Sequence, residues 1–96
     1  MEYRYSLNDT VKISQESSSG WRGKLAVILG LNENIYGEPA YKIAVDVGTS
    51  FCPAALLVDE KDLHRLGLLE SLKIRRRFPS RNIVSGVELV HETELL

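Results

Sequence analysis

The sequence predicts a mainly β protein, in which a small antiparallel sheet closes into a barrel with one short helical turn. Two observations carry this prediction. Apolar and polar residues alternate with a period of two over residues 10–14 and 41–47, as they do in strands with one buried face. Residues typical of tight turns and loops separate the apolar segments, and short strands separated in this way are typical of small barrels.

A chain of 96 residues has the length of one domain, and we expect residues 1–96 to form a single one. The composition, 44% apolar and 26% charged, is that of an ordinary globular protein. We expect a barrel core over about residues 7–66, followed by a C-terminal extension over residues 67–96.

In the first half of the chain, strands are expected over residues 10–14 and 24–31. Val11 and Ile13 point to one face of the first strand. The second segment, KLAVILGL, is a continuous apolar run that is short enough for a buried strand. A loop is expected over residues 34–40, which contain a glycine and a proline.

The clearest alternation covers residues 41–47. One face of this strand carries its large apolar side chains, Tyr41, Ile43, Val45 and Val47. A glycine-containing turn then leads to a partner strand over residues 50–58. Because Pro53 within this partner has no N–H to donate, we expect the segment to lie at a sheet edge or a bulge.

The rest of the chain gives weaker patterns. Asp59 has the chemistry of a helix N-cap and Gly67 that of a helix terminator, so a helix of about two turns is expected between them. Residues 68–78 fit either a helix or an extended strand. Residues 83–90 are expected to be extended, although Gly86 weakens that pattern.

The net charge of −1 is unevenly distributed along the chain. Residues 1–72 hold seven Lys or Arg and ten Asp or Glu, residues 73–81 hold five Lys or Arg and no acid, and residues 82–96 hold three Glu. The three segments therefore carry charges of −3, +5 and −3. The middle segment, which we call the basic block, would attract anions or acidic partners.

The basic block is the candidate anion-binding or nucleic-acid-binding site. It combines cations for phosphates with one aromatic ring for a base, in Lys73, Arg75, Arg76, Arg77, Phe78 and Arg81. Three other interpretations stay open: a solvated face, contact with an acidic protein, or internal pairing with Glu88, Glu92 and Glu94. The isoelectric point of about 6.1 disfavours a dedicated nucleic-acid binder.

A second candidate site would bind a protein partner. Trp21 lies beside Arg22 in a loop flanked by glycines, and Trp and Arg are enriched at interface hot spots. Together with Tyr36 in a later loop, Trp21 and Arg22 form the predicted partner-binding set. The alternative for Trp21 is an indole ring that folds back and caps the small barrel.

The sequence contains no catalytic or metal-binding motif that we can identify. Cys52 lies in an apolar segment with no basic residue nearby to activate its thiol, and His64 and His91 lie far apart in charged stretches. Metal sites need clustered His, Cys or carboxylate ligands. We therefore expect no enzymatic activity, no metal and no cofactor.

Three features favour a cytoplasmic location. A lone cysteine cannot form an internal disulfide. The start of the sequence, MEYRYSLNDT, lacks the features of a signal peptide. No apolar run approaches the ~20 residues of a membrane span, so we expect no membrane partner.

Residues 7–31 resemble the opening of an SH3-like barrel, and more narrowly of its KOW-type variant. That pattern consists of a turn and strand, here DTVKI from residue 9, and of glycines at three-residue spacing before an apolar strand, here GWRGKLAVI from residue 20. Close passage of the backbone at the loop exit requires residues without side chains. The sequence departs from the pattern at Ala26, where the family has the last of these glycines. The resemblance continues loosely over about the first two thirds of the chain.

This resemblance implies two kinds of function. KOW-like proteins bind RNA or transcription complexes, whereas small bacterial SH3-like proteins that look similar include immunity proteins, which neutralise a toxin by direct binding. Because one such barrel serves many functions, the fold alone does not choose between them.

Three functional hypotheses follow. The leading one is a non-enzymatic protein-binding module, acting as an immunity protein or small inhibitor. The alternative is a KOW-like RNA- or DNA-associated module that uses the basic block, and the third is an accessory subunit of a larger complex. The oligomeric state is left open.

Overall fold

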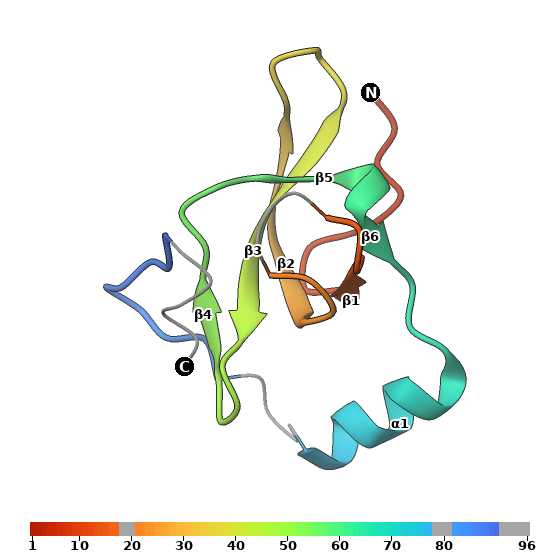
Figure 1. Cartoon of the computed structure of the whole chain (residues 1–96), viewed down its shortest axis with the longest axis vertical. Coiled ribbons are helices and arrows are strands. Elements are labelled where there is room, and N and C mark those ends of the chain that lie inside the picture. Colours follow the sequence, from red (N-terminus) through yellow and green to blue (C-terminus); the bar gives the residue numbers. More distant parts are fainter. Residues whose placement is uncertain (18–20, 78–81, 91–96) are drawn as a thin grey trace.

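The structure is a computed structural model that describes residues 1–17, 21–77 and 82–90. Within these residues it contains six β-strands, one 3₁₀ turn and one α-helix (Figure 1). In chain order they are β1 (Thr10–Ile13), β2 (Leu25–Glu33), β3 (Pro39–Asp46), β4 (Phe51–Pro53), β5 (Val58–Asp59), η1 (Glu60–Asp62), β6 (Leu63–His64) and α1 (Leu68–Arg77).

The strands form one antiparallel sheet in the order β4-β3-β2-β1-β6. β3 pairs with β2 along one side and with β4 and then β5 along the other. The chain continues from β5 through η1 into β6, which pairs with β1 at the far side of the sheet, so the sheet curls around its inner face (Figure 1). The predicted mainly β, antiparallel fold with a short helical turn is confirmed.

The inner face of the sheet encloses the main core. Val11 and Ile13 of β1 are buried there. They pack with the side chains that the alternation had placed on one face of β3, Tyr41, Ile43 and Val45. The period-two patterns therefore assigned the buried faces of both strands correctly.

The outer face of the sheet is also covered, by a second and smaller cluster. It is built by Val27 of β2, Ala44 of β3 and Phe51 of β4, together with Ile74 of α1. β3 is consequently buried on both faces, which is why Ala44, on the side opposite the large apolar residues, has no exposed surface. Among the described side chains of α1, Ile74 alone is buried.

In the segment 68–78, which fitted either a helix or a strand, Leu68–Arg77 form the helix α1, and Phe78 lies outside the described residues. The helix begins directly after Gly67 and docks on the outer face of the sheet through Ile74. An exposed ion pair, with 3.7 Å between Lys12 Nζ and Glu70 Oε2, joins α1 to β1. A screened surface pair of this kind contributes little, so the burial of Ile74 is the principal anchor of the helix.

Residues 82–90 lie along the outer edge of β4. The N–H of Phe51 donates to the carbonyl of Asn82 at 2.9 Å, and the N–H of Leu89 donates to the carbonyl of Pro53 at 2.8 Å. The segment thus pairs with β4 at both of its ends, in parallel orientation. It supplies partners to a strand edge that would otherwise stay unpaired.

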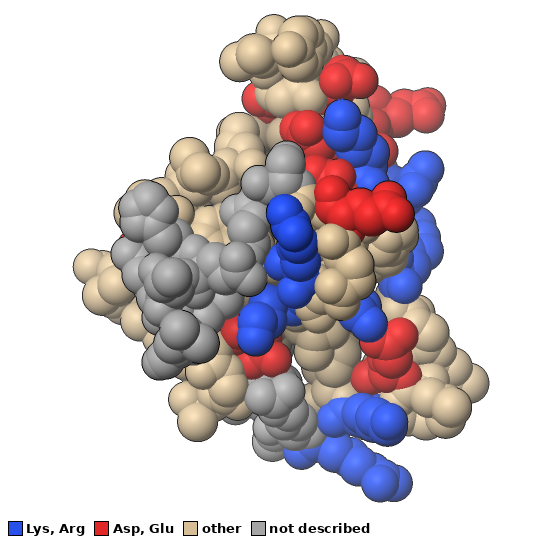
Figure 2. Space-filling model, in the orientation of Figure 1, with Lys and Arg blue, Asp and Glu red and all other residues tan. Residues whose placement is uncertain are grey.

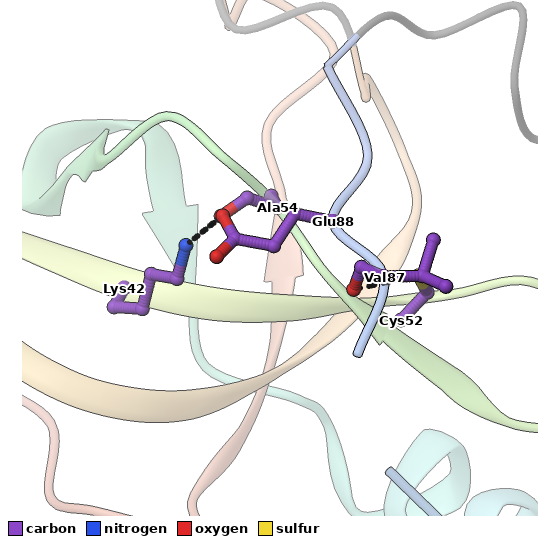
Figure 3. Close-up of polar contacts among 5 residues, drawn as sticks. All are labelled: Lys42, Cys52, Ala54, Val87 and Glu88. Atoms are coloured by element: carbon purple, nitrogen blue, oxygen red, sulfur yellow. Dashed lines mark hydrogen bonds and ion pairs between the residues drawn. The ribbon is translucent and has the colours of Figure 1, made fainter. Parts of the chain in front are cut away.

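Side-chain contacts hold this segment between its two paired ends. Lys42 of β3 donates to Glu88 at 2.8 Å, and the Sγ atom of Cys52 lies 3.9 Å from the carbonyl of Val87 (Figure 3). The expected strand over residues 83–90 is confirmed only at the two pairing points, because Gly86 turns the backbone with φ = +81°.

The two-turn helix predicted between Asp59 and Gly67 is wrong. Only Glu60–Asp62 form a 3₁₀ turn, and Leu63 returns to extended backbone with φ = −116° and ψ = 146°. The Asp59 side chain makes no capping hydrogen bond. Leu63 is instead buried in the main core, where β6 pairs with β1. Burial and strand pairing outweigh the local helix signals here.

The central position of β3 gives a test of the fold. Replacing Val45 by Ala removes two buried methyl groups from a side chain with no exposed surface, and should lower the free energy of unfolding by about 1–3 kcal/mol. Urea denaturation followed by circular dichroism measures this change. Val87→Ala, at a valine that is 57% exposed, is the matched control and should change stability by less than about 0.5 kcal/mol. Equal effects of the two substitutions would contradict the core described above.

Candidate functional site

The solvent side of α1 carries three leucines. Leu68, Leu69 and Leu72 are 79%, 74% and 47% exposed. Spacings of three and four residues bring Leu69 and Leu68, respectively, onto the same helix face as Leu72. Ile74, two positions after Leu72, lies on the opposite side of a helix with 3.6 residues per turn. Docking of Ile74 on the sheet therefore turns the leucines toward solvent.

The same helix concentrates positive charge. Lys73 and Arg76 are exposed, and the helix holds four basic residues against one acidic residue, a net charge of +3, through Lys73, Arg75, Arg76, Arg77 and Glu70. In Figure 2, Lys and Arg side chains lie at the end of the molecule where α1 is, and others are spread over the rest of this face. We call the exposed set Leu68, Leu69, Leu72, Lys73 and Arg76 the α1 surface.

A small cavity of about 200 Å³ lies beside the α1 surface, between the helix and the start of β2. Leu25 and Ile74 supply its apolar walls, and Lys73 and Glu70 line it as well. Pockets for small-molecule ligands usually enclose roughly 300–1,000 Å³. This cavity is below that range and suits a single large side chain.

The tip of the β2–β3 hairpin is a second exposed apolar feature, at the opposite end of the long axis from α1 (Figure 1). Ile35 and Tyr36 are 92% and 80% exposed. The side-chain oxygen of Asn34 accepts hydrogen bonds from the backbone N–H groups of Tyr36 and Glu38 at 2.9 and 3.0 Å. Gly37 permits the turn with φ = +76°. The tip is thus an ordered turn that presents two large apolar side chains.

Acidic residues flank this tip. Glu33 and Glu38 lie on either side of Ile35 and Tyr36 and are exposed. Residues 29–41 contain no Lys or Arg, so this part of the hairpin carries a charge of −2. Figure 2 shows Asp and Glu side chains close to the apolar end of the molecule where the hairpin projects. We call Glu33, Ile35, Tyr36 and Glu38 the hairpin tip.

The predicted partner-binding set is only partly at the surface. Trp21 has no exposed surface and packs in the main core, so the expectation of a contact surface centred on its ring is corrected. Arg22 is exposed, but its Nε donates to the carbonyl of Ser17 at 2.9 Å and so closes the loop. A small domain has little core to bury, and the large indole supplies much of it. Tyr36 is the member of the set that is exposed.

The basic block is placed in part. Lys73 and Arg76 lie on the exposed side of α1, and Arg75 and Arg77 belong to the same helix. Phe78 and Arg81 lie outside the described residues, as do Glu92 and Glu94. Of the three glutamates considered as internal partners of the block, Glu88 pairs with Lys42 at 2.8 Å.

Tyr41 and Glu60, whose pKa values are shifted, form a clasp between the N-terminal segment and the sheet. The Tyr41 hydroxyl donates to Glu60 at 2.5 Å, and the Arg4 N–H donates to the same Glu60 oxygen at 2.8 Å. Burial, followed by the hydrogen bond to Glu60, raises the pKa of Tyr41 to about 12. Partial burial pushes the pKa of Glu60 upward, but the hydrogen bonds from Tyr41 and Arg4 outweigh it and lower the pKa.

Aromatic packing completes this clasp. The rings of Tyr3 and Tyr5 meet the Tyr41 ring edge to face, with centroids 5.7 and 5.6 Å away. The Tyr5 hydroxyl donates to the carbonyl of Leu63 at 3.0 Å, and the Arg65 guanidinium lies 5.7 Å from the Tyr5 ring centroid. Shifted pKa values often mark functional sites. Here each polar atom is engaged in fastening residues 3–5 to the core, and we interpret the clasp as structural.

The candidate catalytic and metal-binding residues are dispersed. Cys52 is buried next to the segment 82–90, His64 is exposed on β6, and His91 lies outside the described residues. Within the described residues, no three His, Cys, Asp or Glu side chains converge on a point that could hold a metal ion. Over the same residues, no helix combines the length and apolar character required to cross a membrane.

Comparisons with protein-family models, with curated proteins and with solved structures find no match to this chain. The likeness of residues 7–31 to SH3-like barrels therefore stays a prediction from the sequence. The α1 surface and the hairpin tip are the features on which a functional proposal can rest.

Glu60 makes the clasp testable by pH. Because the pKa of Glu60 is lowered on folding, its stabilisation is complete above the ordinary pKa of 4.5 and is lost as the pH falls through the lowered value. We expect Glu60→Gln to be less stable than the wild-type chain at pH 7, and the difference to shrink on acidification to pH ~3. Urea unfolding over this pH range measures both. Glu16→Gln, at an exposed turn position, is the control, and a Glu60→Gln deficit that stays constant with pH would contradict the role of the charged carboxylate.

Proposed function

We propose that this chain is a non-enzymatic protein-binding module that presents the α1 surface to an acidic, partly apolar surface of another protein. The observation that carries the proposal is the exposure of Leu68 and Leu69 at 79% and 74%, on a helix with a net charge of +3. Immunity proteins and small inhibitors act by direct binding to another protein. We propose a function of this kind for the chain, in the cytoplasm.

The leucines favour a contact that excludes water. Burying a leucine side chain on association is worth about 1.5–3 kcal/mol before the costs of association. Leu69 and Leu72 share one face of α1, on the side opposite Ile74, and both are exposed. An apolar centre of this kind is typical of interface hot spots.

The cations define the chemistry of the partner. Lys73 and Arg76 border the leucines and are exposed. At the rim of an interface such charges speed association and select partners of opposite charge more than they add affinity. A partner helix with leucines on one face and acidic residues beside that face would match both the leucines and the cations of the α1 surface. Helices commonly dock by such apolar faces.

Binding of RNA or DNA by the basic block is the second candidate. Lys73 and Arg76 are available to phosphates, and the four basic residues of α1 favour a polyanion. The exposed leucines of α1 contribute nothing to phosphate binding, and the chain as a whole has a net charge of −1. We therefore rank the protein partner first.

A peptide titration tests the proposal. The probe is a synthetic helical peptide of about 20 residues, with leucines at three- and four-residue spacing and glutamates at the margins of that face. We expect it to shift the NMR signals of α1 in the labelled protein. The double variant Leu69→Ser, Leu72→Ser should weaken binding by roughly 30-fold, which corresponds to about 2 kcal/mol. Val87→Ser and Val90→Ser, at exposed valines of the segment 82–90, are the matched control.

A scrambled peptide and a single-stranded oligonucleotide complete the experiment. The scrambled peptide has the same charge without the leucine face and should bind at least tenfold more weakly. Oligonucleotide binding with a log–log salt slope of roughly −3.5 to −4.5, as expected for about five phosphate contacts, would support the second candidate. If that binding were also insensitive to the leucine substitutions and the peptide caused no shifts, the protein-binding proposal would be overturned.

A further inference from the structure

We propose that the hairpin tip of one copy of this chain binds the α1 surface of a second copy, so that the molecules associate head to tail. This inference rests on the proposed function of the α1 surface and names one occupant for it. It also accounts for the second exposed apolar feature, Ile35 and Tyr36, which the α1 surface alone leaves without a role.

The two surfaces are chemically complementary. Each has an apolar centre, of leucines on α1 and of Ile35 and Tyr36 at the hairpin. The centres are bordered by charges of opposite sign, since residues 29–41 carry −2 and α1 carries +3. Contact between the hairpin tip and the α1 surface therefore buries apolar groups on both sides and pairs acidic with basic residues. Contact between two hairpin tips, or between two α1 surfaces, would bring charges of the same sign together.

The hairpin tip also offers a side chain of the right kind for the leucine face of α1. Tyr36 is exposed on a turn that Asn34 holds in place. A tyrosine has an apolar ring and a polar end. In the proposed contact the ring lies against Leu69 and Leu72 of the second copy, and the hydroxyl reaches Lys73 or Arg76 at the margin of that face.

The placement of the two surfaces determines the geometry of association. The hairpin and α1 lie at opposite ends of the molecule (Figure 1), whose longest dimension is 37 Å. One copy cannot satisfy its own α1 surface with its own tip. A contact between two different surfaces is heterologous, and it generates a ring where the rotation closes and an open chain where it does not.

The proposed contact is small and the association should be weak. A tip with two large apolar side chains buries less than the roughly 800 Å² per partner of standard interfaces. We expect a dissociation constant on the order of 100 μM, so that the average mass rises with concentration between about 10 μM and about 1 mM.

Sedimentation velocity of the full chain over this concentration range is the first measurement. Tyr36→Ala and the double variant Leu69→Ser, Leu72→Ser change exposed side chains, so each should fold as judged by circular dichroism and each alone should stay monomeric. Val87→Ala, also at an exposed position, should associate like the wild-type chain.

Mixing the two defective variants is the decisive step. The Tyr36→Ala copy keeps an intact α1 surface, and the leucine variant keeps an intact hairpin tip. One functional contact can then form between them, and the mass should rise again but stop at two copies. An added salt concentration of about 0.5 M should weaken this pairing by severalfold, because the flanking charges are exposed.

Three outcomes would overturn the proposal. They are a chain that stays monomeric at about 1 mM, a Tyr36→Ala variant that associates like wild type, and a mixture that stays monomeric. Association that survives Tyr36→Ala but is lost in the leucine variant would indicate pairing of two α1 surfaces. In each case the acidic peptide of the preceding experiment reports separately on the α1 surface, so failure of self-association and failure of the proposed function are distinguishable.

Discussion

The structure depends on one strand being buried on both faces and paired on both edges. β3 contributes Tyr41 and Val45 to the main core and Ala44 to the outer cluster. Its backbone pairs with β2 on one side and with β4 and β5 on the other. A domain of this size buries only a small core. Because β3 belongs to both clusters, it connects the elements packed on the inner face of the sheet with those packed on the outer face.

The two exposed surfaces follow from this arrangement. β2 and β3 stay paired from Ala26 and Val45 out to Glu33 and Pro39, which carries their connecting turn away from the core and leaves Ile35 and Tyr36 without neighbours to bury them. At the other end, the outer cluster holds α1 by one side chain on one face. The helix then has no means of burying its leucines, and its position turns them outward.

Period-two alternation predicted the faces of β1 and β3 correctly, because the main core selects alternate residues. Local signals failed where tertiary contacts compete with them. Asp59 and Gly67 resemble helix ends, yet burial of Leu63 and its pairing with β1 keep the segment extended. Trp21 lies in a loop, and sequence position does not show that its ring turns inward. The three- and four-residue spacing of the leucines in α1 is typical of a buried helix face. The docking of Ile74 shows that the opposite face of the helix is the buried one.

The net charge does not show how the charges are distributed over the molecule. The value of −1 suggests a nearly neutral molecule, yet the acids of the hairpin and the bases of α1 lie at opposite ends of its long axis. Such segregation orients molecules as they approach, over distances of about a Debye length, roughly 8–10 Å at physiological salt. Each charged end also surrounds an apolar centre, so the orientation imposed by charge is the one that brings apolar groups into contact. In the proposed contacts, the charges of the α1 surface would select and orient the partner, and the leucines would be buried against it.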